Sequence, residues 1–368
     1  MLFYLTDSLI VAQTDTTYKN IYKAIQNISL QVIDSRHLLT GDFKVIEHFR
    51  TVFKENPIIG PLFNDLYQNF STKGVPEQLT FYIEVVLKNP TKRTEGTKTI
   101  CQKSYSHFLT LDHILEARIV CEDLYDAEFY KYILSWFIQT KGCNCSFAFH
   151  NQGGGGVNIS RTVKEELSKK HITLCIVDTD KKYESCPYDL NGTYGKCLSV
   201  GLTADEYKLL PIEVHEVENL VPLNFIDIAF PLYTKKNAND QRHKKHFDYL
   251  KKDAENLLPF FDYKKGIRKD ELFEKNSEYR NFAKKCYILN DEKIKEEEDF
   301  DTYVDRLDSK EVYPNLIGGT GTIKMALDLI NGSSCPQPNL LTFQNDNWMK
   351  IGQTMLDWCI SRDTESIH

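Results

Sequence analysis

The chain has 368 residues, of which 41% are hydrophobic, 26% charged and 12% aromatic. A chain of this length can bury a sizeable core and hold two or three domains. The formal net charge is −7, which excludes a protein that is basic over its whole surface. A nucleic-acid enzyme is compatible with this composition provided that it carries local basic patches.

The sequence shows no signal for export or for a membrane. Its opening stretch lacks a basic n-region and is interrupted by Asp7, and no apolar run approaches the roughly 18 residues of a bilayer span. Ten cysteines are scattered along the chain, including Cys121 and Cys175 within apolar runs. This usage is typical of reduced thiols, so we expect a cytoplasmic protein. Cys143 and Cys145 have no second pair at zinc spacing, and we favour ordinary thiols there.

Residues 1–112 mix helical and strand-like patterns and form the first predicted region. Residues 45–55 (VIEHFRTVFKE) and 60–70 (GPLFNDLYQNF) are typical of helices, and residues 78–87 (QLTFYIEVVL) are typical of a strand. We find no motif with recognisable chemistry there, so we assign this region no role.

Residues 113–232 alternate between strand and helix patterns and form the second predicted region. Apolar runs at 117–123, 145–151 and 172–180 predict strands, and the segments 125–140 and 158–170 between them have helical periods. This β-α-β-α-β order predicts an α/β, Rossmann-like fold with a mostly parallel sheet and right-handed crossovers.

Residues 233–368 are charged and form the third predicted region, a helical one. The end of the chain, residues 345–362, has the pattern of an amphipathic helix. The basic stretch near its start could contact phosphates, although such a stretch is commonly a solvated helix face. Its predicted nucleic-acid-binding residues are Lys235, Lys236, Arg242, Lys244 and Lys245.

Three acidic clusters follow predicted strands. In an open parallel sheet, ligands collect outside the carboxyl ends of the strands, so we expect these clusters to lie near one another. Carboxylates a few ångströms apart repel one another unless a cation lies between them, and oxygen ligands suit Mg²⁺ or Mn²⁺. The clusters are Glu122 with Asp126, Asp178 with Asp180, and Glu216 with Glu218.

In this order, the segments IVCEDLYDAEFY, DTD and HEVENL resemble the motifs of the TOPRIM domain, the metal-binding module of topoisomerases, bacterial primases and OLD-type nucleases. Within that family, the chain is most similar to single-domain TOPRIM proteins and OLD-like nucleases that work beside an ABC-type ATPase in bacterial phage defence. The resemblance covers about 110 of the 368 residues. One departure is Asp123, which stands where the family usually has Gly.

The resemblance implies a Mg²⁺-dependent endonuclease that hydrolyses phosphodiester bonds in DNA or RNA as the toxic effector of a defence system. It implies that Glu122 is the general acid/base or first metal ligand and that Asp178 and Asp180 are metal ligands. Asp126 and Glu218 would complete a second metal site. An ATPase partner or homo-oligomerisation would restrain such an enzyme, an expectation that depends on family analogy alone.

Two other hypotheses stay open. A non-catalytic TOPRIM-like module would bind a partner such as an ATPase, or nucleic acid, and its carboxylates would be splayed or paired with lysines and arginines. A nucleotidyl- or glycosyl-transferase would use Asp178 and Asp180 to hold a metal–nucleotide complex. A lone DxD is also common in turns, and acids near a helix N-terminus are favoured by the helix dipole.

Two glycine runs and two histidines complete the sequence features. Residues 153–156 (GGGG) precede a predicted helix, where backbone N–H groups can bind an anion, but the G-x-x-x-x-G-K-[ST] motif of a nucleotide motor is missing. We leave open a substrate-side loop or a flexible connection, and we expect residues 318–322 (GGTGT) to form a turn. His150 and His215 are near the inferred site, where a structural role and proton transfer are the alternatives.

Overall fold

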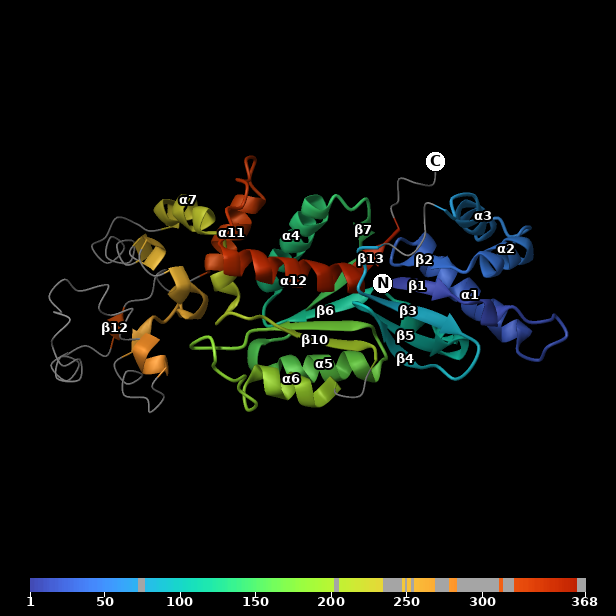
Figure 1. Cartoon of the computed structure of the whole chain (residues 1–368), viewed down its shortest axis with the longest axis horizontal. Helices are drawn as coiled ribbons and strands as arrows, with labels where there is room; N and C mark the ends of the chain where they lie inside the picture. The colour runs from blue at the N-terminus through green and yellow to red at the C-terminus, as the bar shows by residue number, and fades with distance from the viewer. Residues whose placement is uncertain are drawn as a thin grey trace. The chain divides into compact units, whose positions relative to one another are not determined.

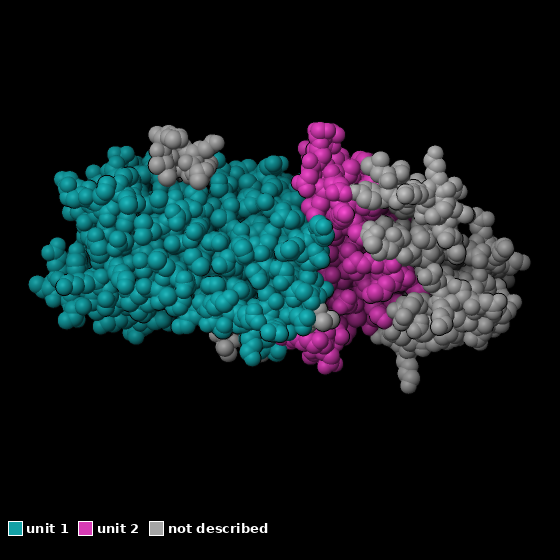
Figure 2. Space-filling view, turned by 180° about the vertical axis from the view of Figure 1, so that it is seen from behind, with its two compact units in different colours: residues 1–176, 197–210, 349–368 teal, residues 177–196, 211–348 magenta. Residues whose placement is uncertain are grey.

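The structure is a computed structural model that describes residues 1–71, 77–201, 205–233, 247–248, 250–252, 255–268, 278–282, 311–313 and 321–362 (Figure 1). By compactness the chain groups into two units, each built from separate segments (Figure 2). Unit 1 comprises residues 1–176, 197–210 and 349–368, and unit 2 comprises residues 177–196 and 211–348. The three consecutive regions expected from the sequence stay a prediction. Within the described residues, no helix has the length and apolar character needed to cross a bilayer.

A five-stranded sheet forms the N-terminal part of unit 1, with strand order β2-β1-β3-β5-β4. All neighbouring strands are parallel except β4, which runs antiparallel to β5 at the edge. The predicted helices at 45–55 and 60–70 are confirmed as α2 (Phe43–Val52) and α3 (Gly60–Gln68). The strands are β1 (Leu2–Leu5), β2 (Leu38–Gly41), β3 (Phe81–Val86), β4 (Lys92–Glu95) and β5 (Lys98–Ser104), and helix α1 spans Tyr18–Ile33.

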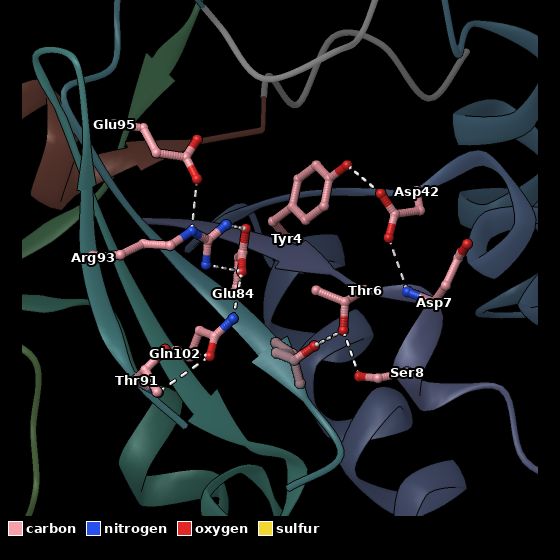
Figure 3. Close-up of polar contacts among 11 residues, drawn as sticks. Tyr4, Thr6, Asp7, Ser8, Asp42, Glu84, Thr91, Arg93, Glu95 and Gln102 are labelled. Carbon is pink, nitrogen blue, oxygen red and sulfur yellow. Dashed lines mark hydrogen bonds and ion pairs between the residues drawn. The ribbon is translucent and has the colours of Figure 1, made fainter. Parts of the chain in front are cut away.

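Polar side chains hold this sheet together (Figure 3). The buried carboxylate of Glu84 on β3 accepts two hydrogen bonds from Arg93 on β4, at 2.7 and 2.8 Å, and one from Gln102 on β5 at 3.0 Å. Burial raises the pKa of Glu84, but the bonds from Arg93 and Gln102 outweigh it and hold the pKa below its usual value. At the end of β2, Asp42 accepts hydrogen bonds from Tyr4 Oη at 2.7 Å and from the backbone N–H of Asp7 at 2.9 Å. The buried Glu84 and the half-buried Asp42 are thus both satisfied by hydrogen bonds within the fold.

The second sheet has four strands in the order β10-β9-β6-β8. Strand β6 (Ala117–Cys121) is parallel to both β8 (Phe149–Gly153) and β9 (Thr173–Val177). Strand β10 (Tyr207–Pro211) runs in the same direction as β9, because Thr173 N donates to Glu206 O and Ile212 N donates to Val177 O. The predicted mostly parallel sheet is confirmed, and it is compatible with a Rossmann-like fold.

Helices cover both faces of this sheet, with α4 (Leu124–Lys141) on one side and α5 (Ile159–Ser168) on the other (Figure 1). Helix α4 buries Phe129, Ile133, Leu134 and Phe137, the positions that the helical period predicts. Strand β9 is buried at every residue, as expected of a strand covered on both faces.

The predicted strand at 145–151 divides in two. Strand β7 (Ser146–Phe147) pairs antiparallel with β13 (Ile360–Ser361), while β8 pairs with β6. Between β7 and β8, Ala148 N donates to Cys359 O at 2.8 Å. The run is divided because its first half pairs with β13 and its second half with β6. A local sequence pattern does not reveal which distant strand pairs with which half.

Unit 2 contains α7 (Leu223–Tyr233), α11 (Thr322–Ile330) and the turns η5 (Val217–Leu220) and η6 (Glu255–Phe260). The predicted C-terminal helix is confirmed as α12 (Thr342–Cys359), whose residues up to Trp348 belong to unit 2. The indole of Trp348 donates to Leu220 O at 3.0 Å, and Gln344 donates to Asn219 O and Val221 O. The start of α12 therefore fixes the backbone of η5.

Candidate metal centre

Within unit 2, the segment that follows β9 is joined to the segment that follows β10. Four hydrogen bonds link them: Ile212 N to Val177 O (3.1 Å), Thr179 Oγ1 to Val214 O (2.8 Å), Asp180 N to His215 O (3.0 Å) and His215 Nδ1 to Lys181 O (2.9 Å). The fold therefore places the predicted acids Asp178 and Asp180 on a loop that runs along the stretch containing Glu216 and Glu218.

The two aspartates of this loop differ in environment. Asp178 is half-buried and directly follows β9, whereas Asp180 is exposed and has a φ of 51°. A left-handed φ is uncommon outside glycine, although aspartate tolerates it better than most residues. Between them, Thr179 is buried with its hydroxyl bonded to Val214 O. The buried threonine anchors the loop.

Glu216 and Glu218 are buried side by side, with only 6% and 4% of their surfaces exposed. Lys264 Nζ lies 3.1 Å from Glu216 Oε2 and 2.8 Å from Glu218 Oε1, so one ammonium bridges both carboxylates. The remaining oxygens, Glu216 Oε1 and Glu218 Oε2, are buried without a hydrogen-bond partner. A buried acceptor without a partner is costly, so these two oxygens suggest a place for a further proton or cation.

His215 and Asp262 adjoin this pair. One ring nitrogen of His215 and one carboxylate oxygen each of Glu216 and Asp262 lie within 4.8 Å of one another. Asp262 Oδ1 accepts the backbone N–H groups of Lys264 and Lys265, and Oδ2 lies 3.5 Å from His215 Nε2. Since a carbonyl only accepts, the contact with Lys181 O places a proton on His215 Nδ1.

Burial and neighbouring carboxylates together disfavour the ionised form of Glu216. Burial raises the pKa of Glu216 to about 7, and the neighbouring Glu218 and Asp262 add to that rise while Lys264 opposes it. Burial lowers the pKa of His215, but the hydrogen bond to Asp262 and the charge of Glu216 outweigh it and raise the pKa overall. Repulsion among the carboxylates therefore favours any positive charge that can enter the cluster.

Asn219 holds the turns of the cluster in place. Its side chain is fully buried, with Nδ2 donating to Leu258 O at 2.7 Å and to Phe261 O at 2.9 Å, and its Oδ1 accepting from Glu216 N at 3.0 Å. One side chain thus links the turn that carries Glu216 to the chain immediately before Asp262. Asn219, which directly follows Glu218, therefore positions Glu216 and Asp262 relative to each other.

The first acidic cluster lies in unit 1, at the junction of β6 and α4. Asp123 caps the helix: its carboxylate accepts from Tyr125 N at 2.8 Å, and Asp126 Oδ2 accepts from Asp123 N at 3.0 Å. Asp123 has an ordinary extended backbone, with φ −126° and ψ 158°, so this position does not require glycine. Glu122 is half-buried beside it. Capping gives Asp126 a structural role beside the predicted one.

The GGGG segment packs against the end of β6. Gly154 N donates to Cys121 O at 2.7 Å, and Gly156 N donates to Glu122 O at 3.2 Å. A Cβ on Gly154 would lie 2.5 Å from Cys121 O, so only glycine permits this approach. The N–H groups of Gly154 and Gly156 therefore donate to backbone carbonyls of the protein itself. The tight packing of Gly154 against β6 favours an ordered connection over a flexible one.

The structure accordingly bonds the loop that carries Asp178 and Asp180 to residues 212–215, which precede Glu218 in unit 2, while Glu122 and Asp126 belong to unit 1. The convergence of both groups on one cation stays a prediction. The basic residues Lys235, Lys236, Arg242, Lys244 and Lys245 lie outside the described residues, as do residues 318–320 of the GGTGT segment. His150 is exposed, and burial raises the pKa of the Cys145 thiol to about 11, which keeps it protonated.

Sequence reasoning missed Asp262, and it considered Lys264 only as part of a basic segment that could contact phosphates, not as a partner of these acids. Each is about 45 residues beyond Glu216 and Glu218, in a segment without periodicity, and only the turn held by Asn219 brings them close. The donor set fits a divalent cation, because it offers carboxylate oxygens, an imidazole and two buried oxygens without a partner.

Comparison of the chain with protein-family models, curated proteins and solved structures finds no match.

Proposed function

We propose that this protein is a Mg²⁺- or Mn²⁺-dependent nuclease of the TOPRIM type. The observation that supports it is the attachment of the Asp178–Asp180 loop to a stretch whose buried carboxylates have oxygens without partners. Acids in ordinary turns are exposed and need no cation, whereas Glu216 and Glu218 are buried. The order of the acidic segments along the chain is the second support.

In this proposal Asp178, Asp180 and Glu218 would hold the cation, which when bound would lower the pKa of a water and offset charge on the phosphate. Lys264 orients Glu218 through the 2.8 Å ion pair, and Thr179 fixes the loop that carries the aspartates. Glu122 has the role that the resemblance implies, general acid/base. The phosphodiester of DNA or RNA would be the substrate.

The biological setting is part of the same proposal. A toxic effector of bacterial phage defence, acting in the cytoplasm with an ATPase partner or as a homo-oligomer, follows from the resemblance alone.

A non-catalytic binding module is the second candidate, and two observations favour it. Lys264 already neutralises part of the charge of Glu216 and Glu218, and Asp123 and Asp126 cap a helix. Both are the pairings expected of carboxylates that serve the fold. The distinction between the two candidates is whether the Asp178 side chain is needed for turnover or only for structure.

Cleavage of plasmid DNA, single-stranded DNA and tRNA in Mg²⁺, Mn²⁺ or EDTA tests the proposal. We expect metal-dependent cutting that falls on the order of 10²-fold or more in Asp178→Asn, Glu218→Gln and Glu122→Gln. Exposed carboxylates provide matched controls, Asp227→Asn in unit 2 and Glu165→Gln in unit 1, and these should cut normally. Cutting that survives Asp178→Asn would refute the assignment. A wild-type protein that binds these nucleic acids without cutting them would support the binding module.

A further inference from the structure

We propose that His215, Glu216 and Asp262 form a separate metal site that takes a divalent transition ion, Mn²⁺ or Zn²⁺, in preference to Mg²⁺. The proposal goes beyond the nuclease and does not depend on it, because it involves different ligand atoms. Those atoms are the ring nitrogen of His215 and one oxygen each of Glu216 and Asp262, which lie within 4.8 Å of one another.

The first support is that the two oxygens of each carboxylate, in Glu216 and in Asp262, have different contacts. Glu216 Oε2 pairs with Lys264 at 3.1 Å, and Asp262 Oδ1 accepts two backbone N–H groups. Each carboxylate is thus held by one oxygen. The other oxygen of Asp262, Oδ2, faces His215 and lies 3.6 Å from Lys265 Nζ, on a side chain that is 75% exposed and can turn into solvent when an ion binds. For Glu216 the second oxygen, Oε1, is buried without a hydrogen-bond partner on a side chain that is only 7% exposed. Lys264 can therefore stay in place when an ion binds.

The second support is the orientation of the imidazole. His215 Nδ1 donates to Lys181 O at 2.9 Å, which leaves Nε2 on the side of Asp262, 3.5 Å from Oδ2. Metal-binding histidines commonly donate their other ring N–H to a carbonyl or carboxylate in this way, which fixes the tautomer and the ring. The backbone N–H of His215 also donates to Pro259 O at 2.8 Å, so the residue is held from both sides.

The third support is the choice of ion. Ligands in a tetrahedron of about 2.1 Å bonds lie about 3.4 Å apart, so the three atoms need only a small side-chain rotation to close on an ion. Imidazole is a ligand that suits transition ions, whereas Mg²⁺ prefers oxygen ligands and retains water. One imidazole with two carboxylates therefore favours Mn²⁺ or Zn²⁺.

Pulsed electron paramagnetic resonance of the full-length protein loaded with Mn²⁺ is the direct test. Coupling of the bound ion to a ring ¹⁴N is expected in the wild type and in Glu218→Gln, and is expected to be lost in His215→Gln. Mn²⁺ affinity, measured by equilibrium dialysis, should fall at least about tenfold in His215→Gln, Glu216→Gln and Asp262→Asn, the size of loss seen even for residues next to metal ligands. The exposed control Asp227→Asn should bind normally.

Three outcomes would overturn the site: a wild type that binds neither Mn²⁺ nor Zn²⁺, bound Mn²⁺ without ¹⁴N coupling, or variants that bind as the wild type does. The wild-type spectrum needs no substitution, so it decides the question even if a variant fails to fold. Nuclease activity is measured separately. A protein that shows the ¹⁴N coupling but cuts nothing would support this site and count against the nuclease.

Discussion

Two groups of buried acids in this protein use the same residue types in opposite ways. In the N-terminal sheet, Glu84 has both oxygens bonded, to Arg93 and Gln102 (Figure 3). In unit 2, Glu216 and Glu218 share a single lysine, and each has one buried oxygen without a partner. A fully satisfied carboxylate stabilises the fold, whereas a buried and partly satisfied one can still take up a proton or a cation. The contrast is the physical basis for treating Glu84 as structural and for proposing Glu216 as a ligand.

The largest expected effect on stability comes from removing the basic side chain that pairs with each group of acids, Arg93 in the sheet and Lys264 in unit 2. Arg93→Met leaves Glu84 buried and unpaired, so we expect a loss of about 3 kcal/mol in the free energy of unfolding, whether or not Mn²⁺ is present. Lys264→Met should cost a similar amount in EDTA, but added Mn²⁺ should restore much of it, since an ion bound at the neighbouring His215, Glu216 and Asp262 supplies positive charge to the same carboxylates. Urea unfolding with and without Mn²⁺ measures both.

Glu95→Gln is the control for this pair, because Glu95 is an exposed partner of Arg93 and should change stability by less than about 0.5 kcal/mol. If Mn²⁺ rescued Arg93→Met as well as Lys264→Met, the contrast between the two groups would be lost.

A buried acid with neutral partners lies between these two cases. Asp357 accepts hydrogen bonds from Thr80 and Gln353, and burial raises its pKa from 3.8 to about 6 despite them. An acid with a raised folded-state pKa adds stability below its unfolded pKa and loses it as pH rises through the folded value. We therefore expect this contribution to fall by as much as about 3 kcal/mol between pH 3.8 and pH 6 and above.

Comparison of wild type with Asp357→Asn by urea unfolding from pH 4 to pH 8 isolates that contribution. The difference between the two proteins should change across this range in favour of the variant. A difference that is constant with pH would show that Asp357 stays ionised without cost.

The smallest expected change in stability comes from replacing a glutamate of each group by glutamine. This change differs in sign between the two groups. Glu84→Gln weakens a charged pair with Arg93, and we expect it to cost about 2 kcal/mol. In metal-free buffer, Glu216→Gln relieves repulsion from Glu218 and Asp262 and is expected to be neutral or stabilising. Thermal unfolding in EDTA compares the two directly. A Glu216→Gln protein as destabilised as Glu84→Gln would mean that Glu216 is a structural acid after all.

The sequence by itself determined the local elements. An apolar period of 3.6 predicted α2, α3, α4 and α12, because it reports which face of a helix is buried. A continuous apolar run predicted β9, because a strand covered on both faces is buried at every residue. The same patterns placed Glu122 after β6 and Asp178 after β9. These predictions need no information from distant parts of the chain.

Tertiary structure alone decided which distant segments meet. The pairing of β10 with β9 places His215 and Glu216 along the Asp178–Asp180 loop, and Asn219 places Asp262 and Lys264 beside them. The competition of β13 for the run at 145–151 is of the same kind. Such contacts depend on closing long loops and on burying shared surfaces, and neither leaves a periodic signal in the residues involved. Glu216, Glu218 and His215 are therefore visible in the sequence, while Lys264 and Asp262 are recognised as their neighbours only in the fold.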